Sequence, residues 1–284
     1  MRIGITGFSL DDTLHPVELA CAVETRGFDS LWLPEHSHIP TSRESPWPGS
    51  LTGEPLPDYY WRMQDQFVAL SMAAAVTERI LLGTSVTLIA QRDAIWLAKQ
   101  VASLDHLSGG RVRLGIGYGW NREEAESHGT VWATRRAAVA EKVALMRALW
   151  TDEVAAFDGE HVRLAPSLAR PKPAQAGGPP VLLGGGWGPK LFDAIGTWGD
   201  GWLPISARAS LGDRLTRLRD VWATKGRDPD RLDVTVLGAT DDLAGLERLA
   251  GEGVTRAVLT LWPAPAEEHL RLLDAWAPLA DRFT

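Results

Sequence analysis

The chain has 284 residues, a length that fits either two average domains or one barrel-sized domain. Charged residues make up 23% of it and the net charge is −7 without long blocks of one sign, which argues against a nucleic-acid-binding protein. No apolar run reaches the roughly 18 residues of a membrane span, and the N-terminal sequence has the pattern of a strand, not of a signal peptide. We therefore expect a cytoplasmic protein that acts on a small molecule, without a nucleic-acid or membrane partner.

Short apolar runs alternate with amphipathic segments along the chain, the pattern of parallel strands joined by crossover helices. The runs predict strands at Arg2–Phe8, Ser30–His36, Ile80–Val86, Val112–Gly119, Val181–Gly186, Gly201–Ile205, Leu232–Gly238 and Thr255–Trp262. Between and after them, helices are predicted at Pro16–Arg26, Gln66–Val76, Ala94–His106, Arg135–Trp150, Pro189–Trp198, Leu211–Lys225, Asp242–Gly251 and Ala266–Arg282. Eight such units close a barrel, so we predict an α/β fold, a (β/α)8 TIM barrel formed by one domain over residues 1–284.

Two segments interrupt this rhythm. Asp158-Gly159 stands between two short apolar runs and predicts a β-hairpin at Val154–Leu164, inserted between the fourth and fifth strands. Ser37–Asp65 is long, irregular and rich in proline, which is typical of lids and binding loops. We expect this second segment to cover a pocket.

The carboxyl ends of the strands form the active-site face of such a barrel. The residues there are rich in glycine and aromatic side chains and poor in acids and bases: Gly7, Phe8, Glu35, His36, Ser85, Val86, Gly117, Gly119, Trp120, Gly185, Gly186, Pro204, Ile205, Leu261 and Trp262. So few titratable groups suit a cofactor that supplies its own reactivity.

Three glycines in a row, Gly184 to Gly186, end the fifth predicted strand. Glycine is useful where the backbone takes a positive φ or where another group must approach it closely. Backbone N–H groups at a strand-to-helix turn also favour an anion. The three glycines could therefore serve a tight turn, a closely packed helix or a bound ligand.

Several stretches together resemble the bacterial luciferase-like superfamily, and within it the deazaflavin (coenzyme F-420)-dependent oxidoreductases. The stretches, in the family's order between Arg2 and Pro204, include GFDSLWLPEH, TERILLGTSV, LAKQVASLDHLSGGRVRLGIGYGWNREEAESHG, PPVLLGGG and GDGWLP. The most specific are LDHLSGGRVRLGIGYGW and LLGTSV. The resemblance implies a luciferase-like barrel and a homodimer.

The resemblance also implies site residues. The family's third strand ends in a bulge, often with a non-proline cis peptide under the deazaflavin ring, and Ser85-Val86 falls there. Glu35 and His36 match the family's acid-histidine pair beside the reactive edge of the ring and are the predicted catalytic residues. The other predicted cofactor-binding residues match the loop along the cofactor side chain and the turn that takes its phosphate: Gly117, Gly119, Trp120, Asn121, Gly184, Gly185 and Gly186.

One position departs from the family. Some members place an acidic proton donor directly after GxGxG, where this chain has Trp120, so sugar-phosphate dehydrogenation is not expected. The acids that follow, Glu123 and Glu124, are interpreted as residues that start a helix, where negative charge is favourable.

Simpler interpretations stand beside these. His36 alone could be a hydrogen-bonded strand-end histidine, and Arg92 either a solvated helix charge or a cation for an acidic coenzyme. His36 and His38 could share a metal, but the other histidines fall in predicted helices, turns or the hairpin, so no metal is expected. Pro189 and the residue after Lys190 break the pattern of a nucleotide-binding P-loop.

The sequence thus predicts a deazaflavin (coenzyme F-420)-dependent oxidoreductase that transfers a hydride between the cofactor and a small organic substrate. An FMN-dependent luciferase-like monooxygenase is the alternative enzyme. A flavin- or deazaflavin-binding protein without turnover is the alternative from another class. The substrate and the direction of hydride transfer stay open.

Overall fold

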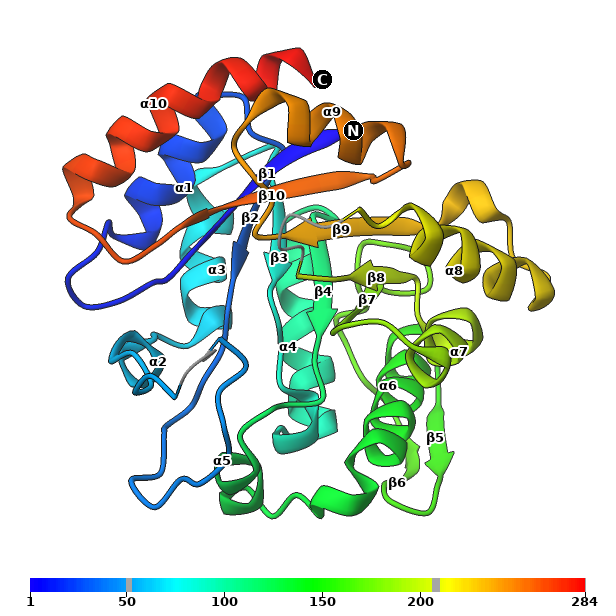
Figure 1. Cartoon of the computed structure of the whole chain (residues 1–284). Coiled ribbons are helices and arrows are strands. Elements are labelled where there is room, and N and C mark those ends of the chain that lie inside the picture. Colours follow the sequence, from blue (N-terminus) through cyan, green and yellow to red (C-terminus); the bar gives the residue numbers. More distant parts are fainter. Residues whose placement is uncertain (50–52, 206–209, 284) are drawn as a thin grey trace.

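A computed structural model describes residues 1–49, 53–205 and 210–283. Eight parallel strands close into a barrel in the order β1-β10-β9-β8-β7-β4-β3-β2, with helices around it (Figure 1). The strands are β1 Arg2–Gly7, β2 Ser30–Leu33, β3 Leu81–Thr84, β4 Val112–Ile116, β7 Val181–Gly184, β8 Gly201–Leu203, β9 Asp233–Leu237 and β10 Arg256–Leu261. The predicted barrel is confirmed, and every strand ends one to three residues earlier than predicted, because the last predicted residues belong to the loops.

The barrel closes where the first strand meets the last. β1 pairs with β10 over its whole length, from Arg2 opposite Arg256 to Gly7 opposite Leu261. In Figure 1 the two chain ends accordingly lie on the same side of the molecule, with α10 beside α1.

The helices follow the predicted positions within one or two residues. The long ones are α1 Pro16–Thr25, α3 Gln66–Val76, α4 Ala94–Leu107, α6 Arg135–Thr151, α7 Pro189–Trp198, α8 Gly212–Thr224, α9 Leu243–Gly251 and α10 Ala266–Arg282. Aspartate side chains cap the first turns of three of them: Asp65 on α3, Asp93 on α4 and Asp242 on α9. The short helix α2 Tyr59–Arg62 lies in a loop and was not predicted, whereas α5 Arg122–Ser127 begins where Glu123 and Glu124 were interpreted as a helix start.

The predicted hairpin is also present. β5 Ala155–Asp158 and β6 Arg163–Ser167 form a separate antiparallel ribbon after α6. Glu141 of α6 accepts hydrogen bonds from the backbone N–H groups of His161 and Val162, which ties the hairpin to the helix.

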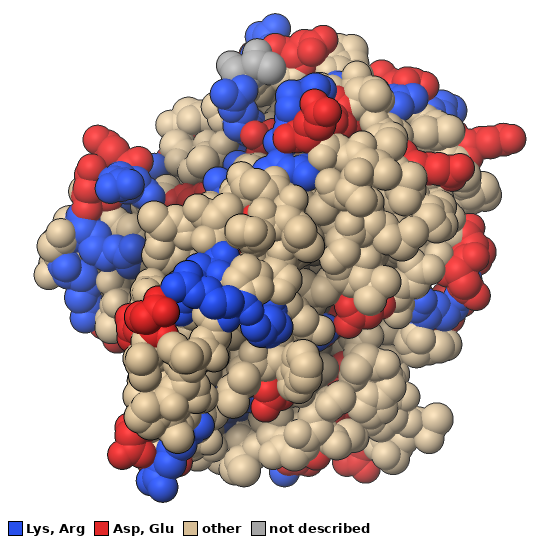
Figure 2. All heavy atoms as spheres, turned by 180° about the vertical axis from the view of Figure 1, so that it is seen from behind, with Lys and Arg blue, Asp and Glu red and all other residues tan. Residues whose placement is uncertain are grey.

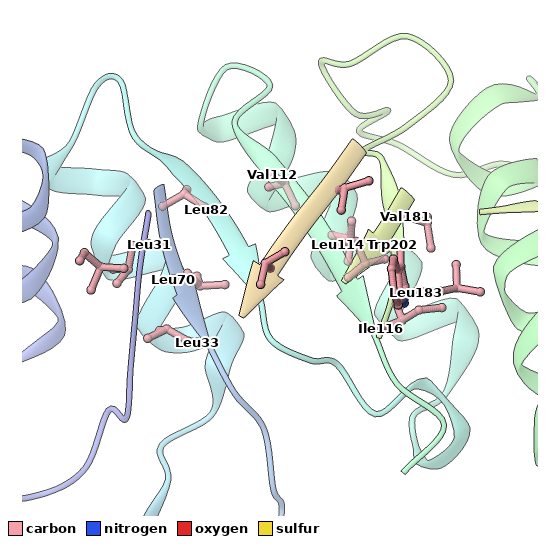
Figure 3. Packing of buried hydrophobic residues seen from close by; sticks show 14 of the residues in the cluster. Leu31, Leu33, Leu70, Leu82, Val112, Leu114, Ile116, Val181, Leu183 and Trp202 are labelled. Carbon is pink, nitrogen blue, oxygen red and sulfur yellow. The ribbon is translucent and has the colours of Figure 1, made fainter. Parts of the chain in front are cut away.

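Alternating strand residues build two apolar layers. The outer layer packs against the helices, and Figure 3 shows Leu31, Leu33 and Leu82 of β2 and β3 grouped with Leu70 of α3. The opposite strand face fills the barrel interior with Trp32, Leu182, Leu203, Leu237 and Val258, and Val86 packs on this inner cluster. Burying each such side chain stabilises the fold by about 1.5 to 3 kcal/mol.

Ion pairs occupy the amino-terminal end of the barrel. Arg256 pairs with Asp29, donates a hydrogen bond to Thr235 Oγ1 at 3.0 Å and lies 3.6 Å from Asp233. Nearby, the Asp200 carboxylate accepts hydrogen bonds from Arg147 at 2.7 Å and Arg227 at 3.2 Å. Arg256 and Asp200 are therefore both paired within the protein.

In the described part of the chain, no helix combines the length and the apolar character that crossing a membrane requires.

Candidate functional site

The predicted site residues of β3, β4 and β7 meet at the carboxyl end of the barrel. The Ser85-Val86 peptide bond is cis, as the resemblance implied. The Val86 side chain packs against the backbone of two neighbouring strands: a Cβ at Gly117 would lie 2.5 Å from Val86 Cγ2, and one at Gly184 would lie 2.8 Å from Val86 Cγ1. The bulge after β3 is therefore fixed by contacts that require glycine on both sides.

The three glycines after β7 serve different purposes. Gly184 is buried and leaves room for Val86. Gly185 is exposed with a φ of +134°, a conformation that side chains disfavour. Gly186 is exposed, and no atom lies within 4 Å of the place where its Cβ would be. Of the three, Gly186 is the one whose surroundings leave space for a ligand.

His36 is held by a carboxylate that sequence analysis had assigned to a helix start. Glu124, in the first turn of α5, accepts a hydrogen bond from His36 Nδ1 at 2.6 Å, and the side chains of His36 and Glu124 are 7% and 1% exposed. Burial raises the pKa of Glu124, but hydrogen bonds from His36, Gln91 and the Ser37 amide outweigh it and lower that pKa overall. Glu124 is thus an ionised partner for the imidazole.

The second ring nitrogen of His36 faces Trp120. The indole Nε1–H of Trp120 donates to His36 Nε2 at 3.3 Å. These two partners together assign the proton of a neutral imidazole to Nδ1 and leave the lone pair on Nε2. His36 is therefore oriented to accept a proton at Nε2.

Glu35 and His36 adjoin in sequence, but their side chains are not brought together. The Glu35 carboxylate pairs with Arg92 and accepts a hydrogen bond from the Leu88 amide at 2.8 Å. Burial raises the pKa of Glu35, and the Arg92 guanidinium offsets part of that effect. Asp65 also pairs with Arg92 at 3.0 Å. The catalytic role of Glu35 stays a prediction, and its visible contacts are those of an ion pair that fixes the strand end.

Aromatic rings from distant parts of the sequence lie together at the mouth of the barrel. Trp262 stacks on Phe8 with centroids 5.7 Å apart, Phe8 contacts Tyr59, and Tyr59 stacks on Tyr60 at 4.9 Å. Tyr60 in turn lies 5.2 Å from the His36 ring. Burial, together with the neighbouring Tyr59, raises the pKa of Tyr60 to about 12, so this hydroxyl stays protonated at neutral pH.

The predicted cover, Ser37–Asp65, supplies both tyrosines; its residues 50–52 lie outside the described part of the chain. The segment is tied to α5 by Glu123, which accepts hydrogen bonds from the backbone N–H groups of Glu44 at 2.9 Å and Ser45 at 3.1 Å. Burial raises the pKa of Glu123, but these bonds and one from the Ser45 side chain lower it to about 2. Glu123 therefore anchors the cover in its ionised form.

Asn121 begins α5 and positions Glu124. Its Oδ1 accepts a hydrogen bond from the Glu124 amide at 3.3 Å, while its buried Nδ2 has no partner among the described residues. Such an unpartnered donor is costly unless a ligand or water binds it.

The histidines do not assemble a metal site. Ser37 Oγ lies 2.9 Å from His38 Nδ1 and 2.7 Å from His128 Nε2, so both of these ring nitrogens have a hydroxyl partner. Across residues 1–49, 53–205 and 210–283, no three His, Cys, Asp or Glu side chains are grouped to hold a metal ion.

Known proteins resemble this chain in sequence over most of its length. A protein of uncharacterised function from Mycobacterium tuberculosis strain ATCC 25618 / H37Rv is 39% identical over 279 residues, 98% of each chain. The F420-dependent glucose-6-phosphate dehydrogenase of Nakamurella multipartita is 31% identical over 231 residues, 76% of this chain and 60% of that relative.

Among solved structures, the monooxygenase RslO1 from Streptomyces bottropensis matches with a TM-score of 0.82 and 20% identity over 100% of both chains, a likeness of fold. The family profile described as luciferase-like monooxygenase matches residues 10–240. With the closed barrel and this match over most of its length, the chain belongs to the luciferase-like monooxygenase family.

Proposed function

We propose that the protein is a coenzyme F-420-dependent oxidoreductase that transfers a hydride between the deazaflavin and a small organic substrate. The observation that carries this proposal is the Glu124-His36 pair, which presents an acceptor nitrogen at the carboxyl end of the barrel. The sequence relative named as an F420-dependent dehydrogenase supports the choice of cofactor. When bound, the deazaflavin ring supplies the hydride chemistry.

The chain offers a fitting place for that cofactor. The Ser85-Val86 bulge would support the ring, and the open backbone at Gly186, next to the start of α7, would take the phosphate. The unpartnered Nδ2 of Asn121 and the half-buried Gly119 and Trp120 would lie along the cofactor side chain.

In this arrangement His36 handles the proton. Nε2 accepts a proton from a substrate hydroxyl, or returns it in the reverse direction, once the substrate takes the place of the Trp120 indole N–H. Glu124 keeps the ring oriented through Nδ1 and stabilises its protonated form. Oxidation of an alcohol and reduction of a carbonyl both need such a group.

The deciding experiment is a side-by-side titration of the purified protein with coenzyme F-420 and FMN. We expect tighter binding of F-420, followed by a substrate-dependent change in its absorbance under anaerobic conditions. Tighter binding of FMN with oxygen-dependent turnover would support the alternative, an FMN-dependent monooxygenase, which the family description and the likeness to RslO1 favour. Stoichiometric binding without turnover of any substrate would indicate a binding protein.

We further propose the homodimer that the resemblance implies, with α3 in the contact. This helix has no charged residue, and Val68, Met72 and Val76 are exposed along one side of it. Figure 2 shows a broad area of the rear face with few charged side chains. Light scattering of Met72→Asp against wild type tests this: a dimeric variant of unchanged stability would place the contact elsewhere.

A further inference from the structure

We propose that the substrate carries a carboxylate, which Arg43 and His38 bind in a cavity beside His36. This inference deepens the proposed function and rests on it. The cavity has a volume of about 480 Å³ and is lined by Ser37, His38, Ile39, Pro40, Thr41, Arg43, Leu56 and Trp61. Its size is that of a pocket for a small ligand.

Arg43 carries a charge that the protein leaves without a counter-ion. Its guanidinium donates to the Ser45 carbonyl and lies 5.6 Å from the centre of the Trp120 ring, and among the described residues no carboxylate pairs with it. Arg92 at this end and the buried Arg256 at the amino-terminal end differ, since each pairs with two carboxylates. In a protein of net charge −7, an unpaired guanidinium at a cavity is available to an anion.

His38 adds a second polar group on the same cavity. Its Nδ1 lies 2.9 Å from Ser37 Oγ, and among the described residues its Nε2 makes no hydrogen bond. The lining of described residues contains no acid, so nothing in it repels a carboxylate. A guanidinium and an imidazole on one wall together recognise a carboxylate better than a neutral polar group.

Trp120 connects this cavity with the reaction centre. Its indole N–H reaches His36 Nε2 while Arg43 lies over its ring. Ser37, a wall residue, directly follows His36 in the chain. A carboxylate held at Arg43 is therefore separated from His36 by the Trp120 ring, and the body of a small substrate packs against the apolar walls formed by Ile39, Pro40, Leu56 and Trp61. The substrate class is a small carboxylic acid with an apolar body that bears the reacting alcohol or carbonyl.

The test measures binding without turnover. Full-length wild type, Arg43→Gln and Arg122→Gln are titrated by calorimetry with benzoate and with benzamide, its uncharged counterpart. Arg122 is exposed, pairs with Glu126 on the nearby α5 and does not line the cavity, so its variant removes the same charge elsewhere. We expect the benzoate dissociation constant to rise about tenfold or more in Arg43→Gln, with benzamide unaffected, and both within about twofold in Arg122→Gln.

The same variants are titrated with coenzyme F-420, because an acidic coenzyme could also present carboxylates to Arg43. Weaker F-420 binding in Arg43→Gln with unchanged benzoate binding would assign Arg43 to the cofactor and overturn the inference. No benzoate binding by wild type, or benzoate binding that does not depend on Arg43 in a variant of unchanged melting temperature, would overturn it as well. Arg43-dependent benzoate binding without any F-420 binding would contradict the proposed cofactor and leave the carboxylate site standing.

Discussion

The two ends of the barrel differ in how they hold particular polar groups. At the amino-terminal end, Arg256 and Asp200 each have two charged partners. At the carboxyl end, Arg43 lacks a carboxylate partner among the described residues, and Gly186 faces open space. We therefore expect mutations at the amino-terminal end to lower mainly the free energy of unfolding, and mutations at the carboxyl end to change mainly binding and turnover.

The largest effect is expected at His36. His36→Ala should lower turnover by about 100- to 10,000-fold, the range of general acid-base catalysis, because no group is left to move the substrate proton. Cofactor affinity and melting temperature should change little. Glu124→Gln should lose less, since it disturbs the orientation of the imidazole and keeps the ring. Steady-state kinetics and melts of both variants provide the check, and turnover of His36→Ala within threefold of wild type would contradict the assignment.

The counterpart at the amino-terminal end is Arg256→Met. Arg256 is 5% exposed, so its loss leaves Asp29 and Asp233 without their partner and should destabilise the fold by about 3 kcal/mol. The kinetic constants of the folded variant should match wild type. Urea denaturation measures the loss; a stable Arg256→Met protein with impaired turnover would break the proposed division between the two ends.

Two glycines of the triplet after β7 should show the same difference between an effect on stability and an effect on binding. Gly186→Val should keep the fold, because its Cβ meets no atom within 4 Å, and weaken cofactor binding about tenfold by blocking the phosphate. Gly184→Ala should instead destabilise the protein by about 1 to 3 kcal/mol, since its Cβ would lie 2.8 Å from Val86 Cγ1. Dissociation constants and melts of the pair distinguish them. Unchanged cofactor affinity in a folded Gly186→Val protein would place the phosphate elsewhere.

The smallest effect concerns the cover in acid. The pKa of Glu123 in the folded protein, about 2, lies below its usual value of 4.5, so its stabilisation is present above the usual value and is lost as pH falls towards 2. Hydrogen exchange at the backbone amides of Glu44 and Ser45, expressed as protection against the intrinsic rate at each pH, should therefore show less protection at pH 2.5 than at pH 4. Glu123→Gln should show the lower protection at both pH values. Equal protection of wild type and variant at pH 4 would mean that Glu123 does not anchor the cover.

The barrel was predictable because its signals are local. Each signal lies within a few residues of sequence: the apolar runs, the glycine and proline breaks, and the Asp158-Gly159 turn. Because the carboxyl ends of the strands meet at one face of a barrel, Ser85, Gly117 and Gly184 could then be placed together. The end of β2 was placed too late because Pro34, which has no N–H to donate to a neighbouring strand, ends β2 at Leu33.

The partners of His36 were not predictable in the same way. Glu124 lies 88 positions from His36, on a loop after β4, which is separated from β2 by β3. Acids after a strand end usually start a helix, and Glu124 does that as well. Arg43 sits in an irregular segment without periodicity, so no sequence pattern points it at Trp120. Contacts between two loops depend on the relative position and direction of the strand ends that carry them, and these are fixed only in the folded barrel.

The seam between β1 and β10 also has a consequence for how the chain is made. The strands that close the barrel lie far apart in the sequence, so native pairing of β1 with β10 must wait until Arg256–Leu261 has left the ribosome. Until then β1 presents an open edge to other nascent chains. Premature termination before Arg256 is therefore expected to yield aggregated or chaperone-bound protein, not a weakened enzyme, and synthesis that slows late in the message prolongs the most vulnerable stage.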